Sequence, residues 1–151
     1  MLCEDCGFVY YVNPSSAVSV FIRNDKRELL VCERGKDPAK GTLDLPGGFV
    51  DNDETAEDAV AREIKEELNV EVTEVKYLFS IPNEYLYSNL TVPTLDMFYE
   101  CRVKSFDTLQ AADDVTRCEF LPVGKISPDD FGLKSVKKAV TKFLSDQGVR
   151  F

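Results

Sequence analysis

Apolar and β-branched residues alternate with short polar segments along most of the 151-residue chain. The pattern predicts strands at 17–23, 28–33, 43–45, 70–81, 93–103 and 117–123, with the first two joined as a hairpin through a turn at Asn24 and Asp25. A polar, tyrosine-bearing connection separates the strands at 70–81 and 93–103. Apolar residues recur at helical spacing in 54–68 and 129–145, which predicts two helices. Strands and helices mixed in this order indicate an α/β fold in which helices cover a sheet.

The first predicted helix places two glutamates where its apolar residues point. At about 100° per residue, Ala59, Val60 and Ile64 form one stripe along the helix. Glu63 and Glu67 fall within that stripe. Acidic runs on helices are usually solvated faces, and this explains Glu57 and Asp58. It does not explain two carboxylates among apolar positions.

The ends of this helix carry their own signals. Thr55 and Asp58 have the spacing of a capping box, so the helix is expected to begin there. The helix is expected to stop at Asn69, because asparagine tolerates the left-handed backbone that often ends a helix.

Three glutamates on the helix form a candidate metal site. Glu63, Glu66 and Glu67 are spaced i, i+3 and i+4, so their carboxylates lie close together. In a half-buried setting their repulsion must be compensated by protons or cations. Oxygen ligands suit hard divalent ions such as Mg²⁺ or Mn²⁺, which also accept substrate phosphates. The spacing therefore predicts a metal site for phosphate chemistry.

Composition narrows the classes of function. The formal net charge of −9 argues against a nucleic acid or an anionic membrane as the main partner. The chain has no histidine, which excludes mechanisms built on imidazole as base, nucleophile or metal ligand. It also lacks a run of about 18 apolar residues and a signal-like start. We expect a single cytoplasmic domain whose natural partner is a cation.

The segment from 48 to 70 resembles the Nudix box. That box is a glycine, five residues, a glutamate, seven residues, and then Arg-Glu-aliphatic-any-Glu-Glu-any-Gly-aliphatic. Asn69 stands where the family has its last glycine, at the left-handed position after the helix. A hairpin ending at Arg34, the turn at 45–48 and the C-terminal helix extend the resemblance over most of the chain. The matching positions are Gly48, Glu54, Arg62, Glu63, Ile64, Glu66, Glu67 and Val70.

The resemblance implies the Nudix fold, an α/β/α sandwich with a mixed β-sheet. It also implies an Mg²⁺- or Mn²⁺-dependent pyrophosphohydrolase acting on acid anhydrides. In such enzymes, water attacks the pyrophosphate of a nucleoside diphosphate linked to another moiety, such as ADP-ribose, NADH or a nucleotide sugar. The metal ligands implied are Glu63, Glu66 and Glu67, one of which is also a candidate base, with the backbone carbonyl of Gly48. Glu54 and Arg62 are then expected to orient the glutamates.

Substrate selection is expected outside the box. The segment 80–88 stands where NADH pyrophosphatases carry Ser-Gln-Pro-Trp-Pro-Phe-Pro-any-Ser, and the central Trp-Pro is absent, which does not favour NADH. The tyrosines of this region have two interpretations, stacking on a base or ordinary packing. The aspartate pair before the last strand is either near the attacking water or a simple turn. The candidate substrate-binding residues are Arg34, Tyr85, Tyr87, Asp113 and Asp114.

Five cysteines make an odd count, and reduced thiols are expected rather than disulfides. Cys3 and Cys6 resemble the second half of the zinc ribbon that precedes some Nudix domains. We therefore expect a partial ribbon-like segment at 1–14 and a Nudix hydrolase domain at 15–151, with Zn²⁺ bound if an upstream half exists. The remaining zinc ligands are not expected from the isolated strand cysteines, which are Cys32, Cys101 and Cys118.

Two other classes of function remain open. A nucleotide-binding sensor or regulator would keep the fold, but the loss of one or more glutamates would be its expected mark, and all three are present. A zinc-dependent interaction module would be built on Cys3 and Cys6. The sequence leaves open whether the protein is a monomer or a homodimer.

Overall fold

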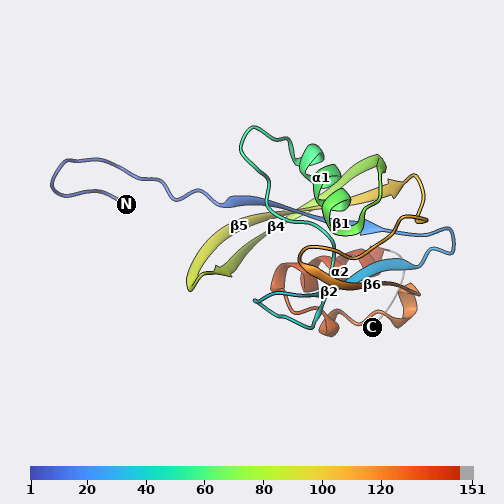
Figure 1. Ribbon diagram of the computed structural model, residues 1–151. Helices are drawn as coiled ribbons and strands as arrows, with labels where there is room; N and C mark the ends of the chain where they lie inside the picture. The colour runs from blue at the N-terminus through green and yellow to red at the C-terminus, as the bar shows by residue number, and fades with distance from the viewer. Residues whose placement is uncertain (147–151) are drawn as a thin grey trace.

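Two helices cover opposite faces of a central β layer (Figure 1). The computed structural model describes residues 1–146, and it describes Tyr87 through its backbone only. Parallel and antiparallel strands occur in one sheet, so the predicted mixed α/β/α fold is confirmed. The elements are β1 (Ser15–Ile22), β2 (Leu29–Arg34), β3 (Leu43–Asp44), α1 (Ala56–Leu68), β4 (Val72–Tyr87), β5 (Leu90–Val103), β6 (Val115–Leu121), the 3₁₀ turns Val123–Lys125 and Pro128–Asp130, and α2 (Lys134–Asp146).

The strands form two three-stranded sheets, with the orders β1-β5-β4 and β3-β2-β6. β1 runs parallel to β5, in a register that begins with Ser15 opposite Thr94. β4 and β2 both pair with their neighbours in the antiparallel direction. No helix within residues 1–146 is long and apolar enough to cross a membrane.

The predicted hairpin between the first two strands is wrong. β1 and β2 belong to different sheets, and an isolated bridge between Arg23 and Leu29 is the pairing where they meet. The second edge of β1 is already occupied, because Val18 N–H donates to Gly48 O at 2.8 Å and Val20 N–H donates to Pro46 O at 2.9 Å. β1 therefore has backbone partners on both sides, and β2 must pair elsewhere.

Alternating residues of β1 face two different cores. Val18 and Val20 pack under α1, whereas Phe21 packs on the other face, where its ring stacks on Phe143 of α2 at 4.1 Å between centroids. A strand buried on both faces has a nearly continuous apolar sequence, as the segment 17–22 does except at Ser19.

Helix α2 begins later than its apolar period indicates. The prediction started at 129, but residues 128–130 form a 3₁₀ turn capped by Ser127, and Phe131 after it is extended. The α-helix begins at Lys134. Apolar spacing does not distinguish a short 3₁₀ turn from the first turn of an α-helix.

The tyrosine-bearing segment is strand and not a connecting loop. β4 and β5 extend to Tyr87 and Leu90, and the turn contains Ser88 and Asn89, with φ of 47° and 64°. Two left-handed residues form the tight turn whose twist matches an antiparallel pair. The sequence prediction ended the strands too early, and Tyr85 consequently projects from a rigid element.

Both predicted ends of α1 are confirmed. The Thr55 hydroxyl accepts the N–H of Asp58 at 3.1 Å, which satisfies a free donor of the first turn. Asn69 ends the helix with φ 55° and ψ 33°, in the left-handed region. Its side chain accepts from Lys65 Nζ at 2.8 Å and donates to Thr108 O at 3.3 Å. Asn69 thus supplies the backbone shape of the family glycine together with two contacts.

We predict that Asn69→Ala lowers the free energy of unfolding by about 1–2 kcal/mol, since the left-handed backbone strains alanine and both side-chain contacts are lost. Asn69→Gly keeps the backbone shape and is expected to lose less. Urea denaturation followed by circular dichroism measures both. An alanine variant as stable as the unsubstituted protein would contradict this account of the helix end.

Candidate functional site

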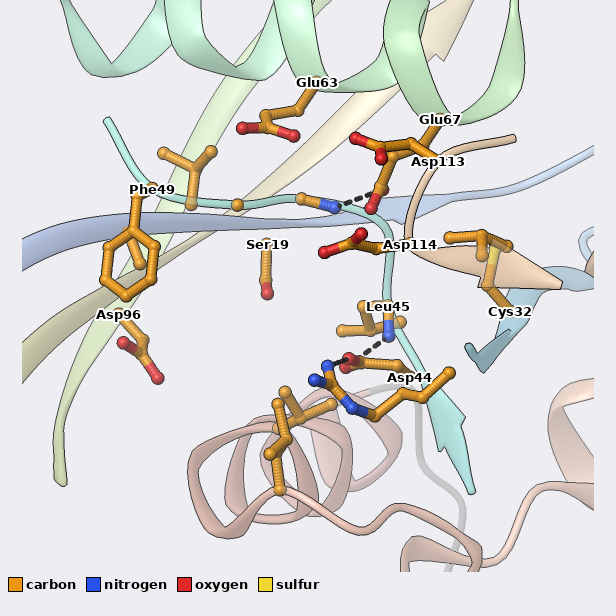
Figure 2. Close-up of a pocket in the computed structure, with 18 of the residues that line it drawn as sticks. Ser19, Cys32, Asp44, Leu45, Phe49, Glu63, Glu67, Asp96, Asp113 and Asp114 are labelled. Atoms are coloured by element: carbon orange, nitrogen blue, oxygen red, sulfur yellow. Dashed lines mark hydrogen bonds and ion pairs between the residues drawn. The ribbon is translucent and has the colours of Figure 1, made fainter. Parts of the chain in front are cut away.

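A cavity of about 410 Å³ lies between α1, β1 and the segment 44–51, which is within the usual range for a small-molecule site. In Figure 2, Glu63 and Glu67 project from α1 at one end of the cavity. Asp113 and Asp114 project toward the cavity from the loop before β6. The glutamates predicted to point with the apolar stripe of the helix therefore face a cavity.

Glu67 is the most buried of the three helix glutamates, with 5% of its surface exposed. Its Oε2 accepts the N–H of Gly47 at 2.9 Å, which fixes the carboxylate against the glycine turn (Figure 2). The side chain of Glu63 is 13% exposed and that of Glu66 is 50% exposed. The three carboxylates thus run from the cavity wall out to solvent.

Position 47 of the glycine turn requires glycine, whereas at position 48 a side chain would collide with the Glu63 carboxylate. A Cβ at Gly47 would lie 2.1 Å from the carbonyl oxygen of Val18, and the residue has φ 145°. A Cβ at Gly48 would lie 2.4 Å from Oε1 of Glu63. The Gly48 carbonyl, an expected metal ligand, accepts Val18 N–H, so its second lone pair is the one available to a ligand.

Arg62 joins the carboxylates on the outer side of the helix. Its Nε and Nη2 each donate to Glu54 at 2.9 Å, while Nη1 donates to Glu63 at 2.8 Å and to Glu66 at 3.2 Å. Nη2 also donates to the carbonyl of Phe49 at 3.0 Å, which ties α1 to the glycine turn. The hydrogen bonds with Arg62 lower the pKa of Glu54. Arg62 and Glu54 are thus positioned to orient the glutamates.

The acidic end of the cavity disfavours further negative charge. Burial raises the pKa of Glu67 to about 8, and the nearby carboxylates of Glu63, Asp44 and Asp114 add to this effect, against the Gly47 hydrogen bond. Burial also raises the pKa of Glu63, although Arg62 opposes the shift. Such a set of oxygen donors suits a hard divalent cation.

The donor set fits Mg²⁺ or Mn²⁺ in its chemistry, and not in its present spacing. Within residues 1–146, no three Cys, Asp or Glu side chains converge closely enough to hold an ion. Glu63 and Glu66 are turned toward Arg62 instead. Binding an ion therefore requires these side chains to turn toward Glu67 while the helix and the glycine turn stay in place.

The structure brings Arg34 and Tyr85 together, a pairing that the sequence did not indicate. Arg34 forms an ion pair with the buried Asp44, donates to Pro38 O at 2.7 Å and donates to the Tyr85 hydroxyl at 3.3 Å. All but Pro38 line the cavity. The other predicted tyrosine, Tyr87, is described by its backbone only.

The aspartate pair of the loop has a basic partner. Lys36 forms an ion pair with Asp114 and lies 3.6 Å from an oxygen of Asp113. These contacts hold the loop that carries both aspartates over the acidic end of the cavity.

Sequence reasoning missed Phe49, Asp44 and Asp96, which also line the cavity. Asp96 and Glu100 are the two acids of the predicted strand 93–103, and an acid within a mostly apolar strand is a signal that was available in the sequence. Phe49 follows the glycine turn and keeps 39% of its surface exposed, which no local pattern indicates.

The two N-terminal cysteines lie far from this site. Residues before β1 extend away from the body of the protein (Figure 1), and both Cys3 and Cys6 are exposed. Hydrogen bonds with Cys6 and with the backbone of Asp5 lower the pKa of the Cys3 thiol. Within residues 1–146 no further Cys, Asp or Glu side chains complete a metal site with them, and zinc binding at these cysteines stays a prediction.

Comparison with known proteins places this site in a family. The sequence model of the NUDIX domain matches residues 13–143. The chain belongs to the NUDIX domain family. The match includes the glycine turn, α1 and the strands of both sheets.

Curated relatives match about half of this NUDIX chain. An ADP-ribose pyrophosphatase of Methanocaldococcus jannaschii is 45% identical over 71 residues, which are 47% of this chain and 41% of the relative. The NAD-capped RNA hydrolase NudC of Chromobacterium violaceum is 42% identical over 78 residues, which are 52% of this chain and 29% of the relative. The chain thus spans less than half the length of these relatives.

Solved structures share the fold over nearly the whole chain. A NUDIX hydrolase from Nitrosomonas europaea has a TM-score of 0.74 and 20% identity, covering 97% of this chain and 79% of that one. The NUDIX domain of Shewanella oneidensis NrtR, solved with ADP ribose, has a TM-score of 0.68 and 19% identity, covering 92% and 91%. At this identity, the likeness concerns the fold alone.

We predict that Gly48→Ala weakens Mn²⁺ binding by about tenfold or more while the protein remains folded, because the new Cβ displaces the Glu63 carboxylate. Calorimetric titration with Mn²⁺ measures the effect. Gly124→Ala is the matched control, since a Cβ there meets nothing within 4 Å. Equal Mn²⁺ affinities in the two variants would show that Gly48 has no part in the metal site.

A second prediction concerns stability in the presence of a chelator. The folded protein holds the Glu67 proton up to pH about 8, whereas the unfolded chain releases it near the ordinary value of 4.5, so the free energy of unfolding falls between these pH values. Glu67→Gln removes this loss. The variant is expected to be more stable than the unsubstituted protein by roughly 2–4 kcal/mol at pH 8.5, and by much less at pH 4.5. Denaturation at both pH values tests this; a pH-independent difference would contradict it.

Proposed function

We propose that the protein is a divalent-metal-dependent hydrolase that cleaves the pyrophosphate bond of a nucleoside diphosphate linked to another group. The observation that carries the proposal is that Glu67, which is buried, and Glu63, which is half-buried, lie beside the Gly47–Gly48 turn at the end of a ligand-sized cavity. Buried carboxylates this close are costly unless a cation binds them. The M. jannaschii relative, named an ADP-ribose pyrophosphatase, supports this substrate class.

The residues of the site have different roles, which follow from their positions. Glu63, Glu66 and Glu67 hold Mg²⁺ or Mn²⁺, assisted by the Gly48 carbonyl. When bound, the metal neutralises the diphosphate and lowers the pKa of the attacking water. Arg62 and Glu54 orient the glutamates through the hydrogen bonds between them. A proton from the water passes to one of the helix glutamates or to the loop aspartates, Asp113 and Asp114.

Arg34 is suited to the part of the substrate beyond the metal. Three of the five guanidinium N–H groups have partners in Pro38, Asp44 and Tyr85. The others remain to donate to a phosphate or ribose oxygen. Because Asp44 and Tyr85 fix the guanidinium, little side-chain freedom is lost when a ligand binds.

We predict that phosphatase-coupled release of phosphate shows cleavage of one class in a panel of ADP-ribose, NADH, diadenosine polyphosphates, nucleotide sugars and nucleoside triphosphates. Chelation should abolish it, and Glu67→Gln should reduce kcat by at least about a hundredfold, since the metal loses its most buried ligand. Glu71→Gln serves as the control, because its ion pair with Lys104 lies on the surface.

The outcome also separates hydrolase from sensor. A folded protein that binds Mn²⁺ and ADP-ribose but cleaves no member of the panel would overturn the hydrolase. It would then be a nucleotide-binding regulator with the same fold. Retention of activity in Glu67→Gln would instead overturn the assignment of the metal ligands.

A further inference from the structure

A row of three residues crosses β1 beside the cavity. Ala17 pairs with Asp96 of β5 on one side and with Phe49 on the other. Residues directly opposite one another on adjacent strands project to the same face. In Figure 2 the Phe49 ring and the Asp96 carboxylate indeed lie on the same side of β1, away from α1. The small side chain of Ala17 stands between them.

The dimensions of this row match a planar ring system. Adjacent strands lie about 4.8 Å apart, so the backbones that carry Phe49 and Asp96 are separated by roughly 10 Å. All three residues line the cavity that also holds Glu63 and Glu67. A ligand whose diphosphate lies at the glutamates can therefore extend its other end into the row.

Asp96 is buried without a cation. It is 9% exposed, and its partners are neutral: Asn83 Nδ2 donates to Oδ2 at 3.0 Å and Thr94 Oγ1 donates to Oδ1 at 2.6 Å. Within residues 1–146 it takes part in no ion pair. A carboxylate accepts about four hydrogen bonds, so lone pairs remain on both oxygens. Asn83 and Thr94 fix its orientation, and a donor on a ligand would complete its shell.

The other side of the row is aromatic. The Phe49 ring meets the Tyr85 ring edge to face, with centroids 5.7 Å apart at 83°. Phe49 nevertheless keeps 39% of its surface exposed. An exposed ring held by a second ring is a surface on which a nucleobase can stack.

We propose that Asp96 is a specificity-determining residue that accepts a hydrogen bond from the exocyclic amino group of a nucleobase stacked beside Phe49. This inference rests on the proposed function, because it assigns the nucleoside end of the same substrate. A base without an amino group leaves the buried carboxylate unsatisfied and is rejected. The aromatic wall favours the base over a ribose hydroxyl as the group that Asp96 contacts.

The test uses nucleoside monophosphates, which have no pyrophosphate bond, and reads binding by calorimetry. AMP and purine riboside 5′-monophosphate differ only in the amino group. The unsubstituted protein is expected to bind AMP about tenfold more tightly or better, as for a charge-assisted hydrogen bond. Asp96→Ala should bring the ratio of the two affinities to about one. Asp96→Asn, which keeps a neutral acceptor, should give an intermediate ratio.

Asp107→Ala is the control, since Asp107 is exposed and outside the cavity. Circular dichroism verifies that each variant is folded. If Asp96→Ala does not fold, the isosteric Asp96→Asn variant still tests the proposal. An unchanged ratio in a folded Asp96 variant overturns the proposal. A third ligand, 2′-deoxy-AMP, tests whether Asp96 contacts the ribose instead of the base. If Asp96→Ala removes the preference for AMP over 2′-deoxy-AMP but keeps the preference for AMP over purine riboside 5′-monophosphate, Asp96 contacts the ribose and the proposal is overturned.

These results are independent of turnover. If the protein hydrolyses no substrate but its preference for AMP disappears on substitution of Asp96, the inference about Asp96 stands and the proposed function is overturned. If the protein is a hydrolase and its Asp96 variants keep the preference for AMP, the proposed function stands and the inference about Asp96 is overturned.

Discussion

The close passage of the Gly47–Gly48 turn over β1 is the constraint on which most of the structure depends. The 2.1 Å available to a Cβ at Gly47 leaves no room for any side chain. The same turn gives its N–H to Glu67, makes space for Glu63 and occupies the second edge of β1. Occupation of that edge sends β2 into another sheet. One backbone contact therefore determines both the geometry of the acidic site and the division of the strands.

Features that depend on neighbours in sequence were predicted well. The capping pair of α1, its left-handed end at Asn69 and the inward direction of Glu63 and Glu67 follow from helix geometry alone. Features that depend on strand register were not. The pairing of Ala17 with Asp96 joins residues far apart in the chain, and no local pattern encodes it. Occupation of the β1 edge by the glycine turn is equally non-local, and the predicted hairpin failed for that reason.

Charge is distributed unevenly between the two ends of the cavity. At the helix, Arg62 is shared among Glu54, Glu63 and Glu66. Glu67, deeper in the cavity, receives a backbone N–H and forms no ion pair with any residue from 1 to 146. At the other end, Arg34 is committed to Asp44, and Asp96 is held by neutral groups. Among the residues that the structure describes, each end thus has one buried carboxylate without a basic partner. This arrangement is expected where ligands rather than side chains supply the positive charge or the hydrogen-bond donors.

The parallel pairing of β1 with β5 also constrains when the site can form. Ser15 must meet Thr94, so most of the chain has to be synthesised before β1 acquires this neighbour. Such long-range closure is entropically slow, whereas the β4–β5 hairpin closes through a two-residue turn. During synthesis, the apolar β1 segment therefore stays unpaired until β5 has been made. The nascent chain would be most prone to aggregation in this interval, before residues 90–103 leave the ribosome.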